Sequence, residues 1–411
     1  MNTFAVKIVR TVLAISLPCL LLSGCWDRLE IEERAVVLGL SIDVRQGDGE
    51  NEEEITHSNE FPVPKQQQIH LAAQIALPGR IPLGPGESGG GNGGSGTRRT
   101  VWVIEVDGYS IDDAIMNLQQ QIASRLFFGH LRVIVVSEDI ARRGLDNLND
   151  YLRRNPEVRR TAWMMVSKGK ALDLMQTAPK LERVPTIYLH STLDEAVRMG
   201  KFPTGFIGVF WSNSVKKGQE GFLPYVDVKK EDNVELQGLA YFKGSRMVGR
   251  SSPLQIAAYL AIKGENPAGY RTFINVGEDS AETLMVYAAR RKSDLDVDIR
   301  DGQPHFKLKV YLEINLEEKV GESISISNAD ILKKIEKVDA AGADKFYIDF
   351  INHTQKFGSD VCGFGEFVRA KYPGYWNTHV RTKEQWQRMY PDIKIEVSTK
   401  TYFRRIGMKA K

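Results

Sequence analysis

The sequence predicts a protein of the mixed α/β (α+β) class with more than one domain. Two patterns support this class. Segments of strand and helix character alternate between residues 100 and 176, and apolar and polar side chains alternate strictly through residues 305–318. Length supports several domains, because a chain of 411 residues is too long for one modest hydrophobic core. We therefore expect two or three domains.

The first 24 residues have the layout of a signal peptide. Lys7 and Arg10 supply positive charge, residues 11–22 carry no charge, and Ser23 and Gly24 are small. The apolar run is too short for a membrane-spanning helix, which needs ~20 apolar residues. We therefore predict a signal peptide over residues 1–24.

The tetrapeptide Leu22-Ser23-Gly24-Cys25 resembles the lipobox of bacterial lipoproteins. In that motif the cysteine thiol receives a diacylglyceryl group, and the chain is cut just before the cysteine. Two acyl chains, at ~0.8 kcal/mol per CH₂, hold a protein stably on a membrane. The alternative is that Cys25 merely follows a signal sequence that is cut elsewhere.

Cysteine count and charge exclude two classes of protein. The other cysteines are Cys19, inside the signal peptide, and Cys362, so the mature chain has no pair for a disulfide framework. The formal charge of +3 falls to about +1 without the signal peptide, which gives no argument for nucleic acid binding. Paired arginines occur at 98–99, 142–143, 153–154, 159–160, 290–291 and 404–405. We interpret them first as solvated surface and second as a patch for anionic lipid or a partner.

An N-terminal α/β domain is expected over residues 25–190. Apolar runs at 35–44 and 68–77 read as strands, and the Gly-rich segment 79–97 has the composition of a loop. Within that segment Gly84, Gly86 and Gly89 match G-x-G-x-x-G. More glycine follows where a phosphate-binding helix would have to start, so we reject a nucleotide site.

Strands and helices alternate in the second half of this domain, which predicts parallel pairing. The expected strands are 100–108, 131–137 and 159–169. The expected helices are 110–126, with Ser110 as N-cap, 138–154, interrupted near Gly144, and 170–176.

Residues 191–235 are less regular and form a middle region or a small middle domain. The segments 206–213 and 221–230 are apolar enough to be strands. A hairpin over 234–252 then opens the C-terminal α+β domain, residues 236–411, and a helix follows up to Gly264.

The C-terminal domain is predicted to be a sheet covered on one side by a long helix. Residues 293–300, 305–318 and 393–403 alternate as strands with one apolar face. A helix from about residue 328 into the 350s places Ile331, Ile335 and Val338 on its inner face.

Residues that could perform chemistry are few. Asp294, Asp296 and Asp298 share one strand face, but calcium needs six or more oxygens, so we favour a solvated face. The seven histidines are scattered, there is no G-x-S-x-G motif, and the lone Cys362 reads as a small buried apolar residue. We predict no enzyme activity, no metal and no cofactor.

Several segments stand out by their order along the chain: "GCWDRLEIEERAVVLGLSIDV", "FGHLRVIVVSEDIARRGL", "YLRRNPEVRRTAWMMVSKGKALDLM", "LQGLAYFKGSRMVGRSS" and "FGSDVCGFGEFVRAKYPGYW" with "IKIEVSTKTYFRRIG". Together they resemble the Ger(x)C family, the C-subunit lipoproteins of spore germinant receptors. The chain departs from the family in the Gly-rich loop and at Gln237-Gly238-Leu239-Ala240.

The resemblance implies three mixed α/β domains and a non-catalytic subunit of a nutrient germinant receptor. Such a protein would be lipid-anchored through Cys25 on the outer face of the spore inner membrane, beside two integral-membrane subunits. Trp26, Asp27 and Arg28 would then lie near the bilayer and touch the membrane or a partner, or serve only as a spacer.

Two rival classes remain open. One is a lipoprotein that binds a small germinant directly, as solute-binding proteins bind their ligands. The other is an envelope hydrolase, which would need clustered carboxylates or a nucleophile pair in a cleft.

Overall fold

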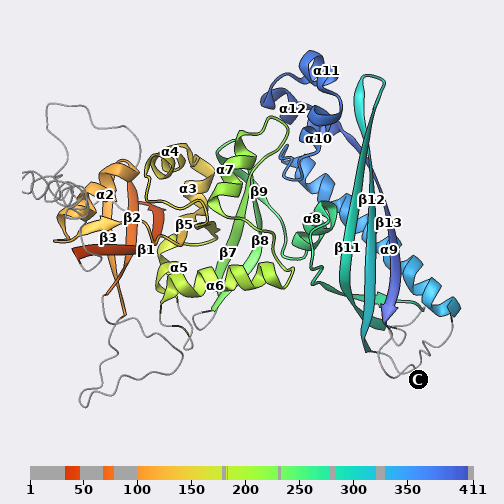
Figure 1. Ribbon diagram of the computed structural model, residues 1–411, viewed down its shortest axis with the longest axis horizontal. Helices are drawn as coiled ribbons and strands as arrows, with labels where there is room; N and C mark the ends of the chain where they lie inside the picture. Colours follow the sequence, from red (N-terminus) through yellow and green to blue (C-terminus); the bar gives the residue numbers. More distant parts are fainter. Residues whose placement is uncertain are drawn as a thin grey trace, which may run out of the picture.

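The structure, a computed structural model, describes residues 33–46, 68–77, 100–177, 182, 184–229, 233–277, 283–320 and 329–405. Cys25, Trp26, Asp27, Arg28 and the Gly-rich segment 79–97 lie outside these residues. Figure 1 shows two sheets side by side along the long axis of the molecule, with a long helix behind the second. Within the described ranges, no helix has the length and apolar character that a membrane crossing needs.

The first sheet has nine strands in the order β3-β2-β1-β5-β6-β7-β8-β9, and β4 pairs with the start of β1. Strands β1, β4, β5, β6 and β7 run parallel, whereas β2, β3, β8 and β9 are added by antiparallel pairing. The strand bounds are β1 Arg34–Val44, β2 Ile69–Ala76, β3 Val101–Gly108, β4 Arg125–Phe127, β5 Val133–Ser137, β6 Trp163–Ser167, β7 Phe222–Lys229, β8 Asn233–Lys243 and β9 Arg246–Arg250.

Helices cover both faces of this sheet, which explains why β5 and β6 are apolar throughout. Alternate residues of β5 face opposite cores: Val133 and Val135 pack with α5 and α6, while Ile134 and Val136 pack with α2, α3, α4 and α7. The helices are α2 Ile111–Gln120, α3 Glu138–Arg143, α4 Asp146–Arg154, α5 Ala171–Gln176, α6 Pro185–Arg198 and α7 Ile207–Val215. The predicted parallel pairing is confirmed.

Two predicted elements are wrong. The helix expected over 110–126 ends at Gln120, because Leu126 joins β4 and pairs with β1 instead, and the Gln119 side chain binds the Leu126 N–H at 2.9 Å. The strand expected over 206–213 is helix α7. An unbroken apolar run has no periodicity to separate the two, and α7 buries Phe210 and Trp211 in the core.

Other local predictions are confirmed. Ser110 caps α2, with its hydroxyl accepting the Asp113 N–H at 3.2 Å. Gly144, at φ 126°, separates α3 from α4. The hairpin β8–β9 forms as expected. The domain bounds stay a prediction, and the first sheet runs across both 190 and 235.

The second sheet has the order β10-β11-β12-β13, with β12 and β13 parallel. Its strands are β10 Arg271–Asn275, β11 Thr283–Arg300, β12 Gln303–Lys319 and β13 Lys394–Arg405. The helices of this part are α8 Gln255–Lys263, α9 Ala329–Lys356, α10 Phe364–Lys371, α11 Pro373–Tyr375 and α12 Lys383–Met389, with a π-helical turn, η4 Trp376–Val380, and a 3₁₀ turn, η5 Tyr390–Asp392.

Helix α9 covers one face of this sheet, as predicted (Figure 1). The alternation along β12 is confirmed, because Phe306, Leu308 and Val310 are buried while Lys307 and Lys309 are exposed. On α9, Ile335 is fully buried and Ile331 packs partly against the core. Val338, the third residue predicted for the inner face of the helix, lines an open groove between helix and sheet and is 37% exposed.

Candidate functional site

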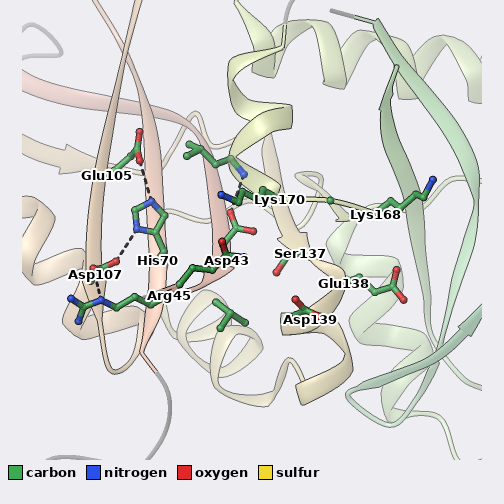
Figure 2. Close-up of a pocket in the computed structure, with 14 residues that line it drawn as sticks. Asp43, Arg45, His70, Glu105, Asp107, Ser137, Glu138, Asp139, Lys168 and Lys170 are labelled. Atoms are coloured by element: carbon green, nitrogen blue, oxygen red, sulfur yellow. Dashed lines mark hydrogen bonds and ion pairs between the residues drawn. The ribbon is translucent and has the colours of Figure 1, made fainter. Parts of the chain in front are cut away.

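A polar cavity of about 790 Å³ lies at the carboxyl ends of the parallel strands β1, β5 and β6 (Figure 2). Ligands of α/β proteins commonly bind at this edge of a sheet. Charged side chains of both signs line it: Asp43, Arg45, His70, Glu105, Asp107, Glu138, Asp139, Lys168 and Lys170.

Asp43 joins β1 to helix α5 on the floor of this cavity. Its carboxylate oxygens accept the Ala171 N–H at 2.8 Å and the Leu172 N–H at 3.0 Å, so they satisfy donors that the start of α5 would otherwise leave unpaired. Burial raises the pKa of Asp43, although these two hydrogen bonds favour the ionised form. The first turn of α5 is thus already occupied by a carboxylate of the chain itself.

His70 lies between two carboxylates of the neighbouring strand. Because His70 pairs with Asp107 across β2 and β3, its Nδ1 lies 2.8 Å from Asp107 Oδ1, and its Nε2 lies 3.1 Å from Glu105 Oε2. Arg45 Nε lies 3.1 Å from the other Asp107 oxygen. Both ring nitrogens therefore face carboxylates, and neither is open to act as a base on a nucleophile.

The opposite wall is formed by the start of α3. Ser137 caps that helix by accepting the Ile140 N–H at 3.5 Å. Glu138 accepts hydrogen bonds from the Tyr225 hydroxyl and from Arg142 Nε, the latter at 2.7 Å. Burial, with the bond to Glu138, raises the pKa of Tyr225.

Most charges around the cavity are therefore engaged with one another. Lys168 pairs with Asp227 at 3.0 Å, whereas Asp139 and Lys170 have no side-chain partner among the described residues. One free carboxylate and one free ammonium suit recognition of a small polar molecule that carries both charges. In the part of the chain that the structure describes, no cluster of His, Cys, Asp or Glu could hold a metal ion.

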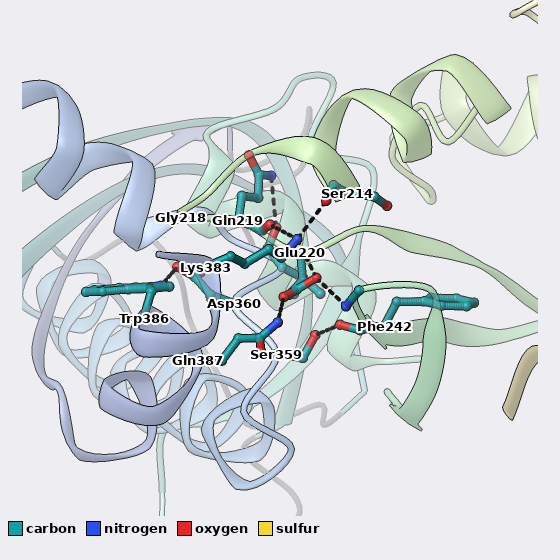
Figure 3. Close-up of polar contacts among 12 residues, drawn as sticks. Ser214, Gly218, Gln219, Glu220, Phe242, Ser359, Asp360, Lys383, Trp386 and Gln387 are labelled. Carbon is teal, nitrogen blue, oxygen red and sulfur yellow. Dashed lines mark hydrogen bonds and ion pairs between the residues drawn. The ribbon is translucent and has the colours of Figure 1, made fainter. Parts of the chain in front are cut away.

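A second polar cluster lies where the C-terminal part meets the first sheet (Figure 3). We call Glu220, Asp360, Lys383, Trp386 and Gln387 the junction. It joins the segment before β7 to the loop after α9 and to helix α12. Ser359 Oγ also donates to the Phe242 carbonyl at 2.6 Å, which ties this loop to β8.

Asp360 holds the loop 359–365 together. Its carboxylate accepts the N–H groups of Gly363 at 2.7 Å, Phe364 at 3.1 Å and Gly365 at 2.8 Å, and the Trp386 Nε1–H at 3.0 Å. Asp360 is 1% exposed, and burial raises its pKa to about 6 against the effect of these four donors.

Glu220 is the other buried carboxylate of the junction, at 2% exposure. Lys383 Nζ lies 2.9 Å from its Oε2 and also donates to the carbonyls of Ser214 at 2.8 Å and Gln219 at 3.0 Å. The Gly244 N–H and the Gln387 side-chain amide complete the partners of Glu220. Every donor of the Lys383 ammonium and both oxygens of the Glu220 carboxylate therefore have partners.

Two glycines let the backbones approach closely at the junction. A Cβ on Gly218 would lie 2.2 Å from the carbonyl carbon of Gly365, and a Cβ on Gly365 would lie 2.5 Å from the Trp386 ring. Larger residues at these positions would separate the two parts of the chain.

An apolar groove of about 370 Å³ lies between α8, α9 and strands β10 to β12. Phe273 at its rim is 62% exposed. Asp339 on its wall accepts a hydrogen bond from Thr401 Oγ1 at 2.7 Å, and burial raises the pKa of Asp339.

The sequence-predicted residues fall in different places. Asp294, Asp296 and Asp298 pair with Lys292, Lys371 and Arg300, which fits the predicted solvated face. Cys362 is a buried free thiol with a raised pKa caused by burial, as expected of a small apolar residue. Cys25, Trp26, Asp27 and Arg28 lie outside the described residues, so their roles stay predictions.

Sequence reasoning missed both the cavity and the junction. One signal was present for each: Asp43, near the end of the apolar run 35–44, and the segment "FGSDVCGFGEF", which carries part of the family resemblance. This segment contains Asp360 and also Gly365, where the backbone lies close to Gly218 and to the Trp386 ring.

Comparisons with known proteins agree over nearly the whole chain. The family model described as "Spore germination protein N-terminal domain" matches residues 27–228, and "Spore germination B3/ GerAC like, C-terminal" matches residues 237–407. The putative spore germination protein YfkR of Bacillus subtilis is 27% identical over 92% of this chain and 92% of its own. Spore germination protein KC of Bacillus subtilis is 25% identical, over 96% and 94%.

A solved structure has the same fold. The crystal structure of the GerBC protein superposes with a TM-score of 0.50 at 16% identity, and the match covers 83% of this chain and 95% of that one.

Because Glu220 is buried beside Lys383, we predict a large loss of folding stability when Lys383 is replaced by an uncharged residue. Lys383→Met leaves the Glu220 carboxylate buried without a cation, which costs about 3–5 kcal/mol. Urea denaturation should show this loss, and Glu220→Gln added to Lys383→Met should restore part of it. Lys371→Met, which breaks a surface pair with Asp296, is the matched control and should lose much less. Equal losses for Lys371→Met and Lys383→Met would contradict this account.

Because its pKa is raised, Asp360 should make the stability of the fold depend on pH. Its pKa is higher in the folded chain than the usual 3.8, so folding takes up a proton between about pH 4 and pH 6. The free energy of unfolding should therefore fall as pH rises through this window, by on the order of 3 kcal/mol. In denaturant titrations at several pH values, the stability of wild type relative to Asp360→Asn should drop across it. A relative rise would mean that the four N–H donors outweigh burial.

Proposed function

The chain belongs to the GerAC family of spore germination proteins, as its sequence motifs predicted, and we propose that it is the lipid-anchored, non-catalytic subunit of a nutrient germinant receptor. In this proposal it lies on the outer face of the spore inner membrane beside two integral-membrane subunits. The observation that carries the proposal is the tetrapeptide Leu22-Ser23-Gly24-Cys25, which resembles a lipobox, in a chain whose relatives include spore germination proteins KC, B3 and A3.

The lipid would act by concentrating the protein. A diacylglyceryl group on Cys25 confines the chain to the membrane plane, which raises its effective concentration near the two membrane subunits. Binding would then stabilise the receptor or bias its conformations without any bond-making step. The junction supports such a role, because its Glu220–Lys383 pair and the neighbouring hydrogen bond from Ser359 to the Phe242 carbonyl hold the two sheets in a fixed relation.

Replacement of Cys25, which removes the site of lipid attachment, tests whether the anchor is needed for germination. In spores that express Cys25→Ala behind a signal peptide with an ordinary cleavage site, we expect the protein in the soluble fraction and impaired nutrient-triggered release of dipicolinate. Membrane fractionation and release kinetics measure the two effects. Normal germination with a fully soluble protein would refute the anchoring role.

Replacement of Trp26 and Asp27 tests whether the residues beside the lipid also contact a partner. The double variant Trp26→Ala/Asp27→Ala keeps Cys25 and therefore the anchor. If these residues touch a partner, germination slows while the protein stays in the membrane fraction. Wild-type germination in this variant would favour the spacer role.

A second candidate function is direct binding of a small germinant, and the polar cavity favours it. Asp139 and Lys170 at its wall provide a free carboxylate and a free ammonium for a zwitterionic ligand such as an amino acid. A ligand that binds only the folded protein raises its melting temperature in proportion to ln(1 + [L]/Kd).

A melting screen of the mature chain with single amino acids and sugars tests this candidate. We expect a concentration-dependent rise for at least one amino acid, lost in Asp139→Ala/Lys170→Ala and kept in Lys333→Ala/Lys337→Ala, a change on the exposed side of α9. No shift with any amino acid or sugar would eliminate this second function and leave the scaffold role untouched.

A further inference from the structure

The amino ends of the parallel strands carry an unusual density of arginine. The residues that lead into β1, β4, β5 and β6, at 33–34, 121–132 and 153–162, contain seven arginines and two glutamates. We call Arg34, Arg125, Arg132, Arg153, Arg154, Arg159 and Arg160 the basic edge. The glutamates are Glu33 and Glu157.

Strand pairing brings these residues together in space. Arg34 and Arg125 are direct partners in the β1–β4 ladder. The Arg132 N–H donates to the Leu38 carbonyl at 2.9 Å, and the Arg132 carbonyl accepts the Trp163 N–H at 2.8 Å. Arg159 and Arg160 lie in the turn just before Trp163. Because neighbouring strands are about 4.8 Å apart, the arginines of four strand ends share one edge of the sheet.

The arginines of this edge are largely free to meet an external anion. Arg125, Arg132, Arg159 and Arg160 are exposed, and none forms an ion pair with a described residue. Arg154 pairs with Asp150, one turn earlier on α4, and Asp112 lines the same shallow groove as Arg125. Glu157 is partly engaged, since it accepts the Phe128 N–H at 2.8 Å.

Aromatic rings hold two more arginines of the edge. The Arg34 guanidinium lies 4.7 Å from the centre of the Phe127 ring, and that of Arg153 lies 5.2 Å from the Trp211 ring. Stacking of this kind orders the side chain and leaves its N–H donors available.

The opposite end of the same strands has a different charge. There the polar cavity contains Asp43, Glu105, Asp107, Glu138 and Asp139 against three basic residues. Charge is therefore separated along the strand direction, with the arginines at the end where β1 begins.

The proposed tether enters the fold at this same edge. Strand β1 begins at Arg34, nine residues after Cys25. Nine residues span at most about 32 Å in any conformation. A lipid on Cys25 therefore keeps Arg34 within about 32 Å of the anchored cysteine, whereas the cavity is a full β1 length further along the sheet.

We propose that the basic edge docks on the anionic phospholipid surface of the membrane that holds the Cys25 lipid, so that the polar cavity faces away from the bilayer. This rests on the proposed anchoring for proximity, and it adds an orientation. Each arginine near an anionic surface strengthens binding by about five-fold. Because the attraction acts over a Debye length of about 8 Å in physiological salt, it requires the edge to lie directly against the headgroups.

The test uses the full mature chain with Cys25→Ala, so that no lipid contributes. Its flotation with vesicles made of equal parts phosphatidylglycerol and phosphatidylcholine should exceed that with phosphatidylcholine alone and should decrease as salt is raised. Arg125→Glu, Arg132→Glu, Arg159→Glu and Arg160→Glu together should weaken binding to the anionic vesicles at least fifty-fold. Thermal unfolding checks that each variant is folded.

The matched control makes the same change of charge elsewhere. Lys333→Glu, Lys334→Glu, Lys337→Glu and Lys345→Glu, all at exposed positions of α9, should leave at least a tenth of the binding. Equal losses in both variants, unchanged binding of the arginine variant, or no preference for anionic vesicles would each overturn the proposal.

A fluorescence experiment tests which end of the first sheet faces the membrane. On the Cys25→Ala background, an environment-sensitive dye on Thr161→Cys at the basic edge should shift its emission when anionic vesicles are added, whereas a dye on Lys170→Cys at the cavity should not. The reverse pattern would overturn the proposal. Binding of the natural lipidated protein to neutral vesicles tests the anchor separately, so a missing lipid and an inactive edge give different results.

Discussion

The buried junction is the constraint on which the arrangement of the whole chain depends. Glu220 and Asp360 are carboxylates removed from water, and such groups are tolerated only with matched partners. Lys383 matches the first, and four N–H donors match the second. The Glu220–Lys383 pair and the hydrogen bond from Ser359 to the Phe242 carbonyl both cross from the C-terminal part to the first-sheet part, so they hold the two sheets in their observed relation.

Because the two sheets are held in a fixed relation, the position of the start of β1 determines the position of the rest of the protein. Whatever holds the chain just before Arg34 also positions the second sheet, its groove beside α9 and the polar cavity. In the proposed receptor, a lipid on Cys25 and the basic edge would therefore present defined surfaces to the membrane subunits. The protein would act through position and contact, which requires a stable shape but no reactive centre.

The sequence predicted those parts of the fold that depend on local periodicity. Alternation along 305–318 gave β12 and its buried face, and the strand and helix pattern of 100–176 gave the parallel core. The prediction from sequence failed where a contact with a distant segment determines the structure: residues 125–127, expected to be helical, pair with β1 as a strand. It also failed at 206–213, because an apolar run without periodicity does not distinguish a strand from a helix. Glu220 and Lys383 are far apart in the chain, so no local pattern could pair them. The family resemblance identified "FGSDVCGFGEF" without its role, which is structural.

The covalent state of the amino terminus tests the central claim most directly. Mass spectrometry of the protein isolated from spore membranes should find a chain that begins at Cys25 with a thioether-linked diacylglyceryl group. An unmodified terminus that begins at any other residue would contradict the account, because nothing would then hold the start of β1 at the membrane.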